Sequence, residues 1–315
     1  MANPISLAMR PVHWLALAGL SVLWGGSFFF VEIALTELPT VTIVALRVSV
    51  AALALLAYLL LTGVRLPRAP GLWGAFAVMA LLNNALPFLC LVWAQGSLTA
   101  GLASILNATT PLFGLVVAHF LTRDEPLSGA RATGVAVGCV GVGVLVGPAA
   151  FGAGDDLALL AMGACVAAAL SYAFASVFGR RFAATGLDPV TVAAGQLCAS
   201  SLMLWPLAVV VDAPWTLSAP SPGTMAAVAT LAIASTAAAY VIYFRLLAAV
   251  GAGNLLFVTQ LVPVSAILLG VVVLGDALVA REIGAMLLIA GGLALTDPRV
   301  RALLLGRGAA RGAGH

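Results

Sequence analysis

The sequence predicts an all-α integral membrane protein with ten transmembrane helices, arranged as two inverted five-helix repeats. Three observations carry this prediction. Only 8% of the 315 residues are charged and 63% are hydrophobic, whereas about a quarter of the residues in a soluble domain are charged. Apolar runs of about 18–22 residues recur along the chain, each long enough to cross the roughly 30 Å core of a bilayer. Polar and helix-breaking residues also recur at a nearly constant offset between the two halves.

The apolar runs define ten expected spans, separated by turn and breaker residues. The first run, Trp14 to Ala34, is long and has no small-x-small cleavage site, so we expect no cleaved signal peptide. The expected spans are residues 13–34, 41–62, 72–94, 98–121, 130–147, 157–178, 189–211, 223–246, 254–274 and 283–296. This division gives a cytoplasmic N-terminus (1–12), a first repeat (13–147), a second repeat (157–296) and an Arg-rich cytoplasmic tail (297–315).

The arginines predict the orientation in the membrane. All fourteen basic residues are arginine. With the N-terminus inside, twelve of them fall in segments expected on the cytoplasmic side, and only Arg281 falls on the other side, where six acidic residues also lie. This asymmetry follows the positive-inside rule and predicts that both termini are cytoplasmic. The net charge of +3 therefore reports topology, and we expect no nucleic-acid partner.

Four pairs of segments repeat in the same order at offsets of 150–152 residues. They are Leu38-Pro39-Thr40 with Asp188-Pro189-Val190, Asn83-Asn84 with Ser235-Thr236, Ala100-Gly101 and Pro111 with Ala252-Gly253 and Pro263, and Arg131–Gly134 with Arg281–Gly284. Five spans are an odd number, so the two halves must cross the membrane in opposite directions. Inverted repeats are a recurrent plan of secondary transporters, whose substrate sites lie near the midplane at the repeat interface.

Several short motifs resemble the signatures of one family. They are Trp24-Gly25-Gly26-Ser27-Phe28 in the first span, Leu46-Arg47 in the second, Pro111 and Pro263 in the fourth and ninth, and Glu125-Pro126-Leu127 before the fifth, with Asp276-Ala277-Leu278 as a looser copy before the tenth. Over about residues 14–297 the chain resembles the EamA-type branch of the drug/metabolite transporter superfamily. The resemblance implies a ten-helix carrier of the bacterial inner membrane with a central cavity between its halves. It also implies export of amino acids or other small metabolites.

The second half departs from the family pattern. Gln196-Leu197 stands where the first half has Leu46-Arg47, and Ser171-Tyr172 stands near the position that corresponds to Trp24-Gly25. A two-fold symmetric site would therefore be uneven in its chemistry. We take Trp24, Ser27, Ser171 and Tyr172 as candidates for the substrate path.

Two prolines indicate where the fourth and ninth spans depart from regular helix. A proline inside a helix frees the carbonyl four residues earlier, which is the carbonyl of Asn107 for Pro111 and that of Thr259 for Pro263. In lipid a free carbonyl must be buried in protein or face a wet cavity. Thr110 and Gln260 add polar groups at the same depth. These helices either line the substrate path or carry kinks that neighbouring hydroxyls and amides satisfy.

The third and eighth spans carry polar side chains at mid-membrane. Asn83 and Asn84 lie in the third span, and Ser235, Thr236 and Tyr240 lie in the eighth. Such side chains usually point into the bundle, where they bond other helices or a ligand. Substrate contact and interhelical hydrogen bonding both remain open for this group.

Two charges fall within apolar runs, Glu32 near the end of the first span and Arg47 about two turns into the second. Charges inside membrane spans are by default functional. Glu32 could carry a coupling proton, and Arg47 could bind a carboxylate or act in gating. The alternative is a structural ion pair between Glu32 and Arg47 near the outer interface.

Other residues with chemical potential point to packing or to interfacial contacts. Cys90, Cys139, Cys165 and Cys198 all lie in apolar runs without a CxxC motif, so we expect neither disulfides nor metal ligation. His119 lies at the end of the fourth span, as an interfacial hydrogen-bonding residue would. Glycines at four-residue spacing, such as Gly134 and Gly138, suit close helix packing, either within one chain or across a homodimer.

The sequence favours a secondary transporter over other classes. It contains no P-loop, so ATP-driven transport by this chain alone is unsupported, and we expect no cofactor and no metal. An intramembrane enzyme would need a buried nucleophile–base pair, paired aspartates or a metal cluster. A passive channel would leave the polar mid-membrane residues without a mobile role. The expected substrates are small neutral or zwitterionic metabolites, with a drug-efflux carrier as the alternative.

Overall fold

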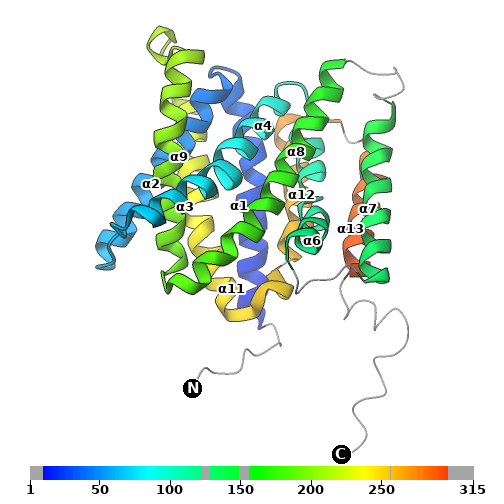
Figure 1. The fold of residues 1–315 in the computed structure, drawn as a ribbon. Coiled ribbons are helices and arrows are strands. Elements are labelled where there is room, and N and C mark those ends of the chain that lie inside the picture. The colour runs from blue at the N-terminus through cyan, green and yellow to red at the C-terminus, as the bar shows by residue number, and fades with distance from the viewer. Residues whose placement is uncertain (1–9, 123–127, 149–155, 256, 278, 297–315) are drawn as a thin grey trace, which may run out of the picture.

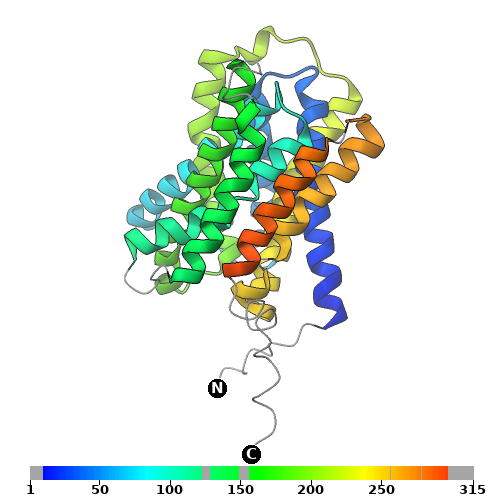
Figure 2. The ribbon, with the colours of Figure 1, turned by 90° about the vertical axis from the view of Figure 1, so that its right-hand side faces the viewer.

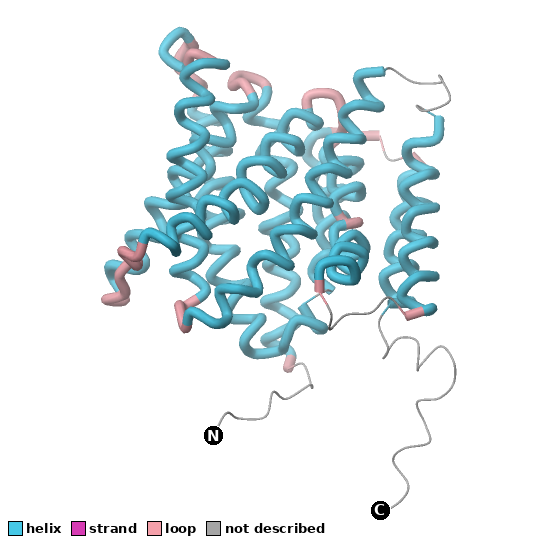
Figure 3. Tube along the Cα trace, viewed as in Figure 1, coloured by secondary structure: helices cyan, strands magenta, loops and turns pink. Residues whose placement is uncertain are grey.

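The computed structural model describes residues 10–122, 128–148, 156–255, 257–277 and 279–296, and these residues form a bundle of helices without strands (Figures 1 and 3). The first half contains α1 (Pro11–Leu35), α2 (Thr40–Leu61), α3 (Pro70–Met79) continued by η1 (Ala80–Ala85) and α4 (Leu86–Gln95), α5 (Ala100–Asn107), α6 (Thr110–Leu121) and α7 (Gly129–Pro148). The second half contains α8 (Asp156–Gly179) with the short η3 (Arg180–Thr185), α9 (Pro189–Val211), η4 (Pro214–Thr216), α10 (Pro222–Ala232) continued by η5 (Ile233–Ala238) and α11 (Ala239–Leu255), α12 (Phe257–Leu269) with η6 (Gly270–Leu274), and α13 (Ala280–Thr296).

These elements confirm the ten expected spans. Among the described residues, eight helices of at least 18 residues are apolar enough to cross a membrane, and a shorter apolar helix covers Val258–Leu274. The 17-residue α13 completes the ten. The ends of the described chain, at α1 and α13, lie at the same end of the bundle (Figure 1), as an even number of spans requires. The Glu125-Pro126-Leu127 turn and the tail over 297–315 lie outside the described residues.

Prolines and polar caps determine where several helices begin. Pro70, Pro189 and Pro222 each occupy the first turn of a helix, where the missing N–H has no intrahelical partner to lose. Asp188 and Ser221 cap the following N–H groups with their side-chain oxygens, which satisfies donors that the helix leaves free. At the other end, Gly251 has φ of 76° and interrupts α11, so the regular helix of the eighth span runs a few residues beyond its expected end at residue 246.

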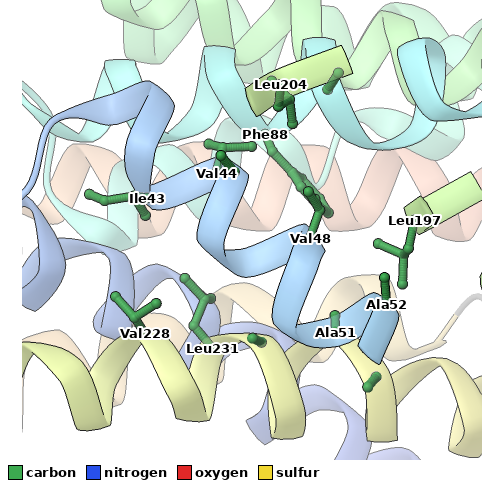
Figure 4. Packing of buried hydrophobic residues seen from close by; sticks show 14 of the residues in the cluster. Ile43, Val44, Val48, Ala51, Ala52, Phe88, Leu197, Leu204, Val228 and Leu231 are labelled. Atoms are coloured by element: carbon green, nitrogen blue, oxygen red, sulfur yellow. The ribbon is translucent and has the colours of Figure 1, made fainter. Parts of the chain in front are cut away.

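Helices of one half pack mainly against helices of the other. The second spans of the two halves, α2 and α9, contact along their length, as do the fourth spans α5 and α12 and the fifth spans α7 and α13. Between α2 and α9 lies the largest core cluster, in which Val48 and Ala52 meet Leu197, and Val44 lies near Phe88 and Leu204 (Figure 4). Several matched helices therefore meet across the interface between the repeats, as those of two inverted halves related by a two-fold axis would.

The glycine-rich spans α7 and α13 run side by side along one edge of the bundle (Figures 1 and 2). A Cβ atom added to Gly292 would lie 2.7 Å from the backbone nitrogen of Gly138, and one added to Gly134 would meet the carbonyl of Gly292. These glycines allow two backbones of the same chain to touch. By contrast, Gly143, Gly284 and Gly291 have open space around them. The expected close packing is thus found within one chain, and the homodimer stays a prediction.

Two carboxylates join the halves at the end of the bundle opposite the chain ends. Asp212, which follows α9, accepts hydrogen bonds from the backbone N–H and the hydroxyl of Thr42 at 2.7 and 2.8 Å. Glu37, in the turn after α1, accepts the backbone N–H of Ser221 at 2.6 Å. Both contacts cross between the repeats, so this end of the bundle is tied across the two halves.

The Glu37 contact predicts a pH dependence of stability. Hydrogen bonds from Ser221 lower the pKa of Glu37 below the usual value of a glutamate, so the contact stabilises the fold above that usual value and is lost as the pH falls through the lowered pKa. We expect the wild type to have a slightly higher Tm than Glu37→Gln at pH 7, and the two to converge as the pH falls below about 4. Thermal unfolding in detergent from pH 7 to pH 3 measures this. A constant difference across that range would contradict the prediction.

Candidate functional site

The third and eighth spans both contain a π-helical turn at their centre. The turns cover Ala80–Ala85 and Ile233–Ala238, which are 153 positions apart. A π-helix inserts one extra residue into an α-helix and is frequently found at functional sites. The candidate residues Asn83 and Asn84 lie in the first turn, and Ser235 and Thr236 lie in the second. The two repeats thus share the same irregular turn at the same place, and each turn carries the polar residues of its half.

A hydrogen-bond network joins the first of these turns to α9 and to the start of α11. The Asn83 amide donates to the Tyr240 hydroxyl and to the Gln196 side-chain oxygen, each at 3.3 Å. Tyr240 donates to the Asn84 oxygen at 3.1 Å, and the Asn84 amide donates to Ser200 at 3.0 Å. The network therefore combines the third span with the seventh and eighth. Shared hydrogen bonds of this kind strengthen one another in a low-dielectric interior.

Arg47 lies at the edge of this network. Its Nε donates to the Thr236 hydroxyl at 3.0 Å, and its guanidinium carbon lies 3.8 Å from the centre of the Phe88 ring, which is a cation–π arrangement. The side chain is 8% exposed. The groups that interact with its charge are the phenols of Tyr172 and Tyr240, and no carboxylate of the described residues forms an ion pair with it.

Glu32 has different partners, so the expected Glu32–Arg47 ion pair is wrong. The Glu32 carboxylate accepts the backbone N–H of Ala100 at 3.3 Å, and the charged group that interacts with it is Asp276. Arg47 instead points from α2 toward η5 and α4. Counting turns from the helix ends places both residues near the outer interface. Their side chains nevertheless point toward different neighbouring helices, which separates them. Glu32 is half-buried against the first turn of α5, where the partial positive charge of a helix N-terminus favours an anion.

Pro111 and Pro263 have different effects on their helices. The fourth span breaks at Ala108 and Thr109, and Pro111 opens the new helix α6. The carbonyl of Asn107 is not free, because the Thr110 hydroxyl donates to it at 2.7 Å. This is the locally satisfied kink that was the alternative to a free carbonyl. Pro263 instead lies inside a continuous α12.

Several buried side-chain atoms near these helices have no hydrogen-bond partner. They include the Asn107 oxygen, the Ser235 hydroxyl and the Gln260 amide nitrogen. Buried polar groups are nearly always hydrogen-bonded, and exceptions are often functional. Asn107 is an acceptor on α5 and Gln260 a donor on α12, two helices that contact each other. A ligand with both a donor and an acceptor would satisfy them.

Three other candidates make local contacts instead of joining the Arg47 network. The Ser27 hydroxyl donates to the carbonyl of Trp24 in its own helix at 2.6 Å, and the Trp24 ring packs against Tyr243 with centroids 5.4 Å apart. Ser171 donates to the carbonyl of Leu82 at 2.7 Å, in the π-helical turn of the third span. Ser171 thus supports the turn, Trp24 belongs to the contact between α1 and α11, and the hydrogen bond of Ser27 stays within α1.

The repeats match a known family. Residues 12–147 and 159–296 each match the model of the EamA-like transporter family. The chain belongs to this family. The resemblance noted in the motifs is therefore confirmed, and the two matched segments are the two halves described above.

Relatives of this EamA transporter are membrane transporters as well. The uncharacterized inner membrane transporter YedA of Escherichia coli (strain K12) is 28% identical, over 84% of this chain and 83% of YedA. A probable amino-acid metabolite efflux pump of the same strain is 27% identical, over 58% of this chain and 56% of that protein. One crystal structure of a protein superposes with a TM-score of 0.67 at 23% identity, over 94% of this chain and 99% of that one. That likeness shows the same fold.

Sequence reasoning missed two residues of this EamA transporter's polar network, Gln196 and Ser200. They are four positions apart on α9, so they share a face. Gln196 stands where the first half carries Leu46, beside the position of Arg47, and was noted only as a departure from the motif. The combination of an amide and a hydroxyl one turn apart in an apolar span was the signal that could have identified them.

Proposed function

We propose that this EamA transporter is a secondary carrier that exports small zwitterionic or neutral metabolites, such as amino acids, from the bacterial cytoplasm by alternating access. The two halves would rock about a site near the membrane midplane, formed where α2, the two π-helical turns and α9 meet. Both termini would face the cytoplasm. The substrate and the lipid bilayer are the partners that the proposal requires.

The proposed substrate class rests on Arg47, which is buried and has no carboxylate partner among the described residues. An uncompensated buried charge is expensive, and charges inside membrane spans usually serve function. A substrate carboxylate would supply the missing anion by a charge-assisted hydrogen bond, which is about twice as strong as a neutral one. The phenol of Tyr172 is near enough to interact with the guanidinium charge and would be a further donor to the same carboxylate. A zwitterionic amino acid fits this arrangement.

The unpartnered groups on α5 and α12 support a polar substrate. Asn107 offers an acceptor for an ammonium group, and Gln260 offers a donor. The efflux-pump relative, described as acting on amino-acid metabolites, supports the same substrate class and direction. The alternative of a drug-efflux carrier is weaker, because an apolar or cationic drug would leave Arg47 unpaired.

The intramembrane enzyme and the passive channel find less support. Among the described residues no group of three or more histidine, cysteine, aspartate or glutamate side chains could hold a metal ion. A channel would need a continuous wet path, whereas Arg47, Asn84 and Thr236 lie in a closely packed core. Saturation and counterflow distinguish a carrier from a channel directly.

The test is transport by the purified chain in proteoliposomes. We expect saturable uptake of radiolabelled amino acids and counterflow, in which unlabelled substrate trapped inside drives entry of label. In cells, overproduction should lower intracellular levels of particular amino acids and confer resistance to their toxic analogues. If a broad metabolite panel shows no change in excretion between deletion and overproduction, the exporter proposal fails.

Glu32 is the candidate for proton coupling. It is half-buried near the end of α1, with Asp276 close enough to interact with its charge, so its protonation would change the charge at the α1–α5 contact. We expect Glu32→Gln to abolish the dependence of transport on an imposed pH gradient while counterflow at equal pH persists. Gradient-driven uptake and counterflow in the same vesicles measure both. Unchanged gradient dependence would remove Glu32 from this role.

A further inference from the structure

An apolar groove lies between α2 and the eighth span. It has a volume of about 310 Å³, within the range of about 300–1,000 Å³ that small-molecule pockets occupy. The lining residues are Ala54, Leu55, Tyr58, Ile233, Ala237, Ala238, Val241 and Ile242. Seven of these eight side chains carry no polar atom, and all eight lie within membrane-spanning helices.

One end of the groove is polar and positively charged. Tyr58 lines the groove, and its hydroxyl accepts a hydrogen bond from Nη2 of Arg245 at 3.1 Å. Arg245 is exposed and lies one turn beyond Val241 on α11, toward the end of the bundle where α1 begins and α13 ends (Figure 1). The groove therefore combines an apolar floor with one cation and one phenol at its mouth.

We propose that this groove holds one acyl chain of an anionic phospholipid whose phosphate binds Arg245. Lipid tails are as apolar as the groove, so burial of the chain gives little preference by itself. Preference must come from the headgroup. An arginine fits a phosphate because its planar fork can donate two hydrogen bonds, and its charge favours a headgroup with a net negative charge over phosphatidylcholine, whose choline cation neutralises the phosphate. A phospholipid joins the two chemistries that the groove and its mouth offer, at the depth where its phosphate would lie.

The bound chain would touch the polar network indirectly. Ile233, Ala237 and Ala238 of the lining belong to η5, and the same turn carries Thr236, the hydrogen-bond partner of Arg47. An acyl chain packed against this π-helical turn therefore contacts the segment that positions Arg47. The lipid site stands whether or not the proposed substrate is correct, because it rests on the groove and Arg245 alone.

The test is native mass spectrometry of the full-length protein after equilibration with an equal mixture of phosphatidylglycerol and phosphatidylcholine. We expect the wild type to retain one phosphatidylglycerol per chain. In Arg245→Gln the retained fraction should fall about fivefold, the effect of one arginine near an anionic lipid. In Ala238→Phe it should fall as well, because the ring fills the groove from an exposed position. The control is Arg181→Gln, which removes an exposed arginine that stacks on Phe178 at 3.4 Å, and it should bind as the wild type does.

Four outcomes would overturn the proposal. They are equal retention of the two lipids by the wild type, no retained lipid at all, wild-type retention by Arg245→Gln, and a lipid-free dimer whose formation Ala238→Phe abolishes, which would show that a second copy covers the groove. Size-exclusion profiles and Tm values confirm that each variant is folded. Because Arg245 is exposed, Arg245→Gln carries the test even if Ala238→Phe fails to fold.

Discussion

Arg47→Met should abolish transport and leave the protein as stable as the wild type or more stable. The guanidinium is buried with a hydroxyl and a ring for partners, and no carboxylate in the described part of the chain pairs with it. Replacing a buried charge by an apolar side chain of similar volume is often neutral or stabilising, by about 1–4 kcal/mol. Loss of a charged hydrogen bond to the substrate costs about 2 kcal/mol or more, which is a factor of about 30 or more in uptake. Stability and transport should therefore change in different directions.

Three measurements make this prediction sharp. Thermal unfolding in detergent gives the stability, and counterflow in proteoliposomes gives the transport. Comparison of an amino acid with its uncharged amide shows whether the carboxylate is the group that Arg47 binds, because Arg47→Met should erase any preference between the two. Arg181→Met, at an exposed arginine, should behave as the wild type in all three. If Arg47→Met transports normally, Arg47 is structural and the substrate class loses its main support; if it unfolds, Arg47 stabilises the core.

Gly25→Ala should destabilise the protein by about 1–3 kcal/mol, the usual cost of overpacking a core. An added Cβ would lie 2.6 Å from the Ser265 Cβ and 2.8 Å from the Val262 carbonyl oxygen and the Ala266 nitrogen. Two of these atoms are backbone, so α12 cannot give way by rotating a side chain. The methyl group would separate α1 from α12, and with it the hydrogen bond of 2.7 Å between the Ser21 and Ser265 hydroxyls.

The matched control lies on the same helix. Gly19 has no atom within 4 Å of an added Cβ, so Gly19→Ala should keep or raise the Tm, since alanine is favoured over glycine in a helix by about 0.8–1.0 kcal/mol. A lower Tm for both variants to the same extent would mean that the loss is a general property of α1. An unchanged Tm for Gly25→Ala would show that α1 and α12 separate at little cost.

The ten spans could be predicted because their signal is simple. Apolar length, breaker residues and arginine placement each depend on a single local property, and the predicted boundaries mostly lie within a few residues of those observed. Asn83, Asn84, Thr236 and Tyr240 could be identified as candidates for the same reason, since polar groups in apolar runs are conspicuous.

Helix rotation and partner choice could not be read in the same way. A π-helical turn shifts the facing of every later side chain, and nothing in ALLNNA or IASTAA distinguishes it from regular helix. Even on the regular helices α1 and α2, counting turns pairs Glu32 with Arg47 because it gives the depth of a side chain and not its direction, although one side chain faces α5 and the other η5. The Thr110 hydroxyl that satisfies the Asn107 carbonyl was considered as an alternative, and three-dimensional geometry was needed to decide it.

The uneven pairing of Leu46-Arg47 with Gln196-Leu197 has a kinetic consequence. If the two halves exchange conformations during transport, an identical pair of halves would present the same site to both faces of the membrane. Here the single guanidinium belongs to one half, so the inward-open and outward-open forms are chemically unlike. The half-saturation concentration for substrate should then differ between the inside and the outside. The size of this difference depends on how much more tightly one form binds the substrate than the other. Unequal affinities change how soon each face saturates, whereas the direction of net flux is still set by the gradients.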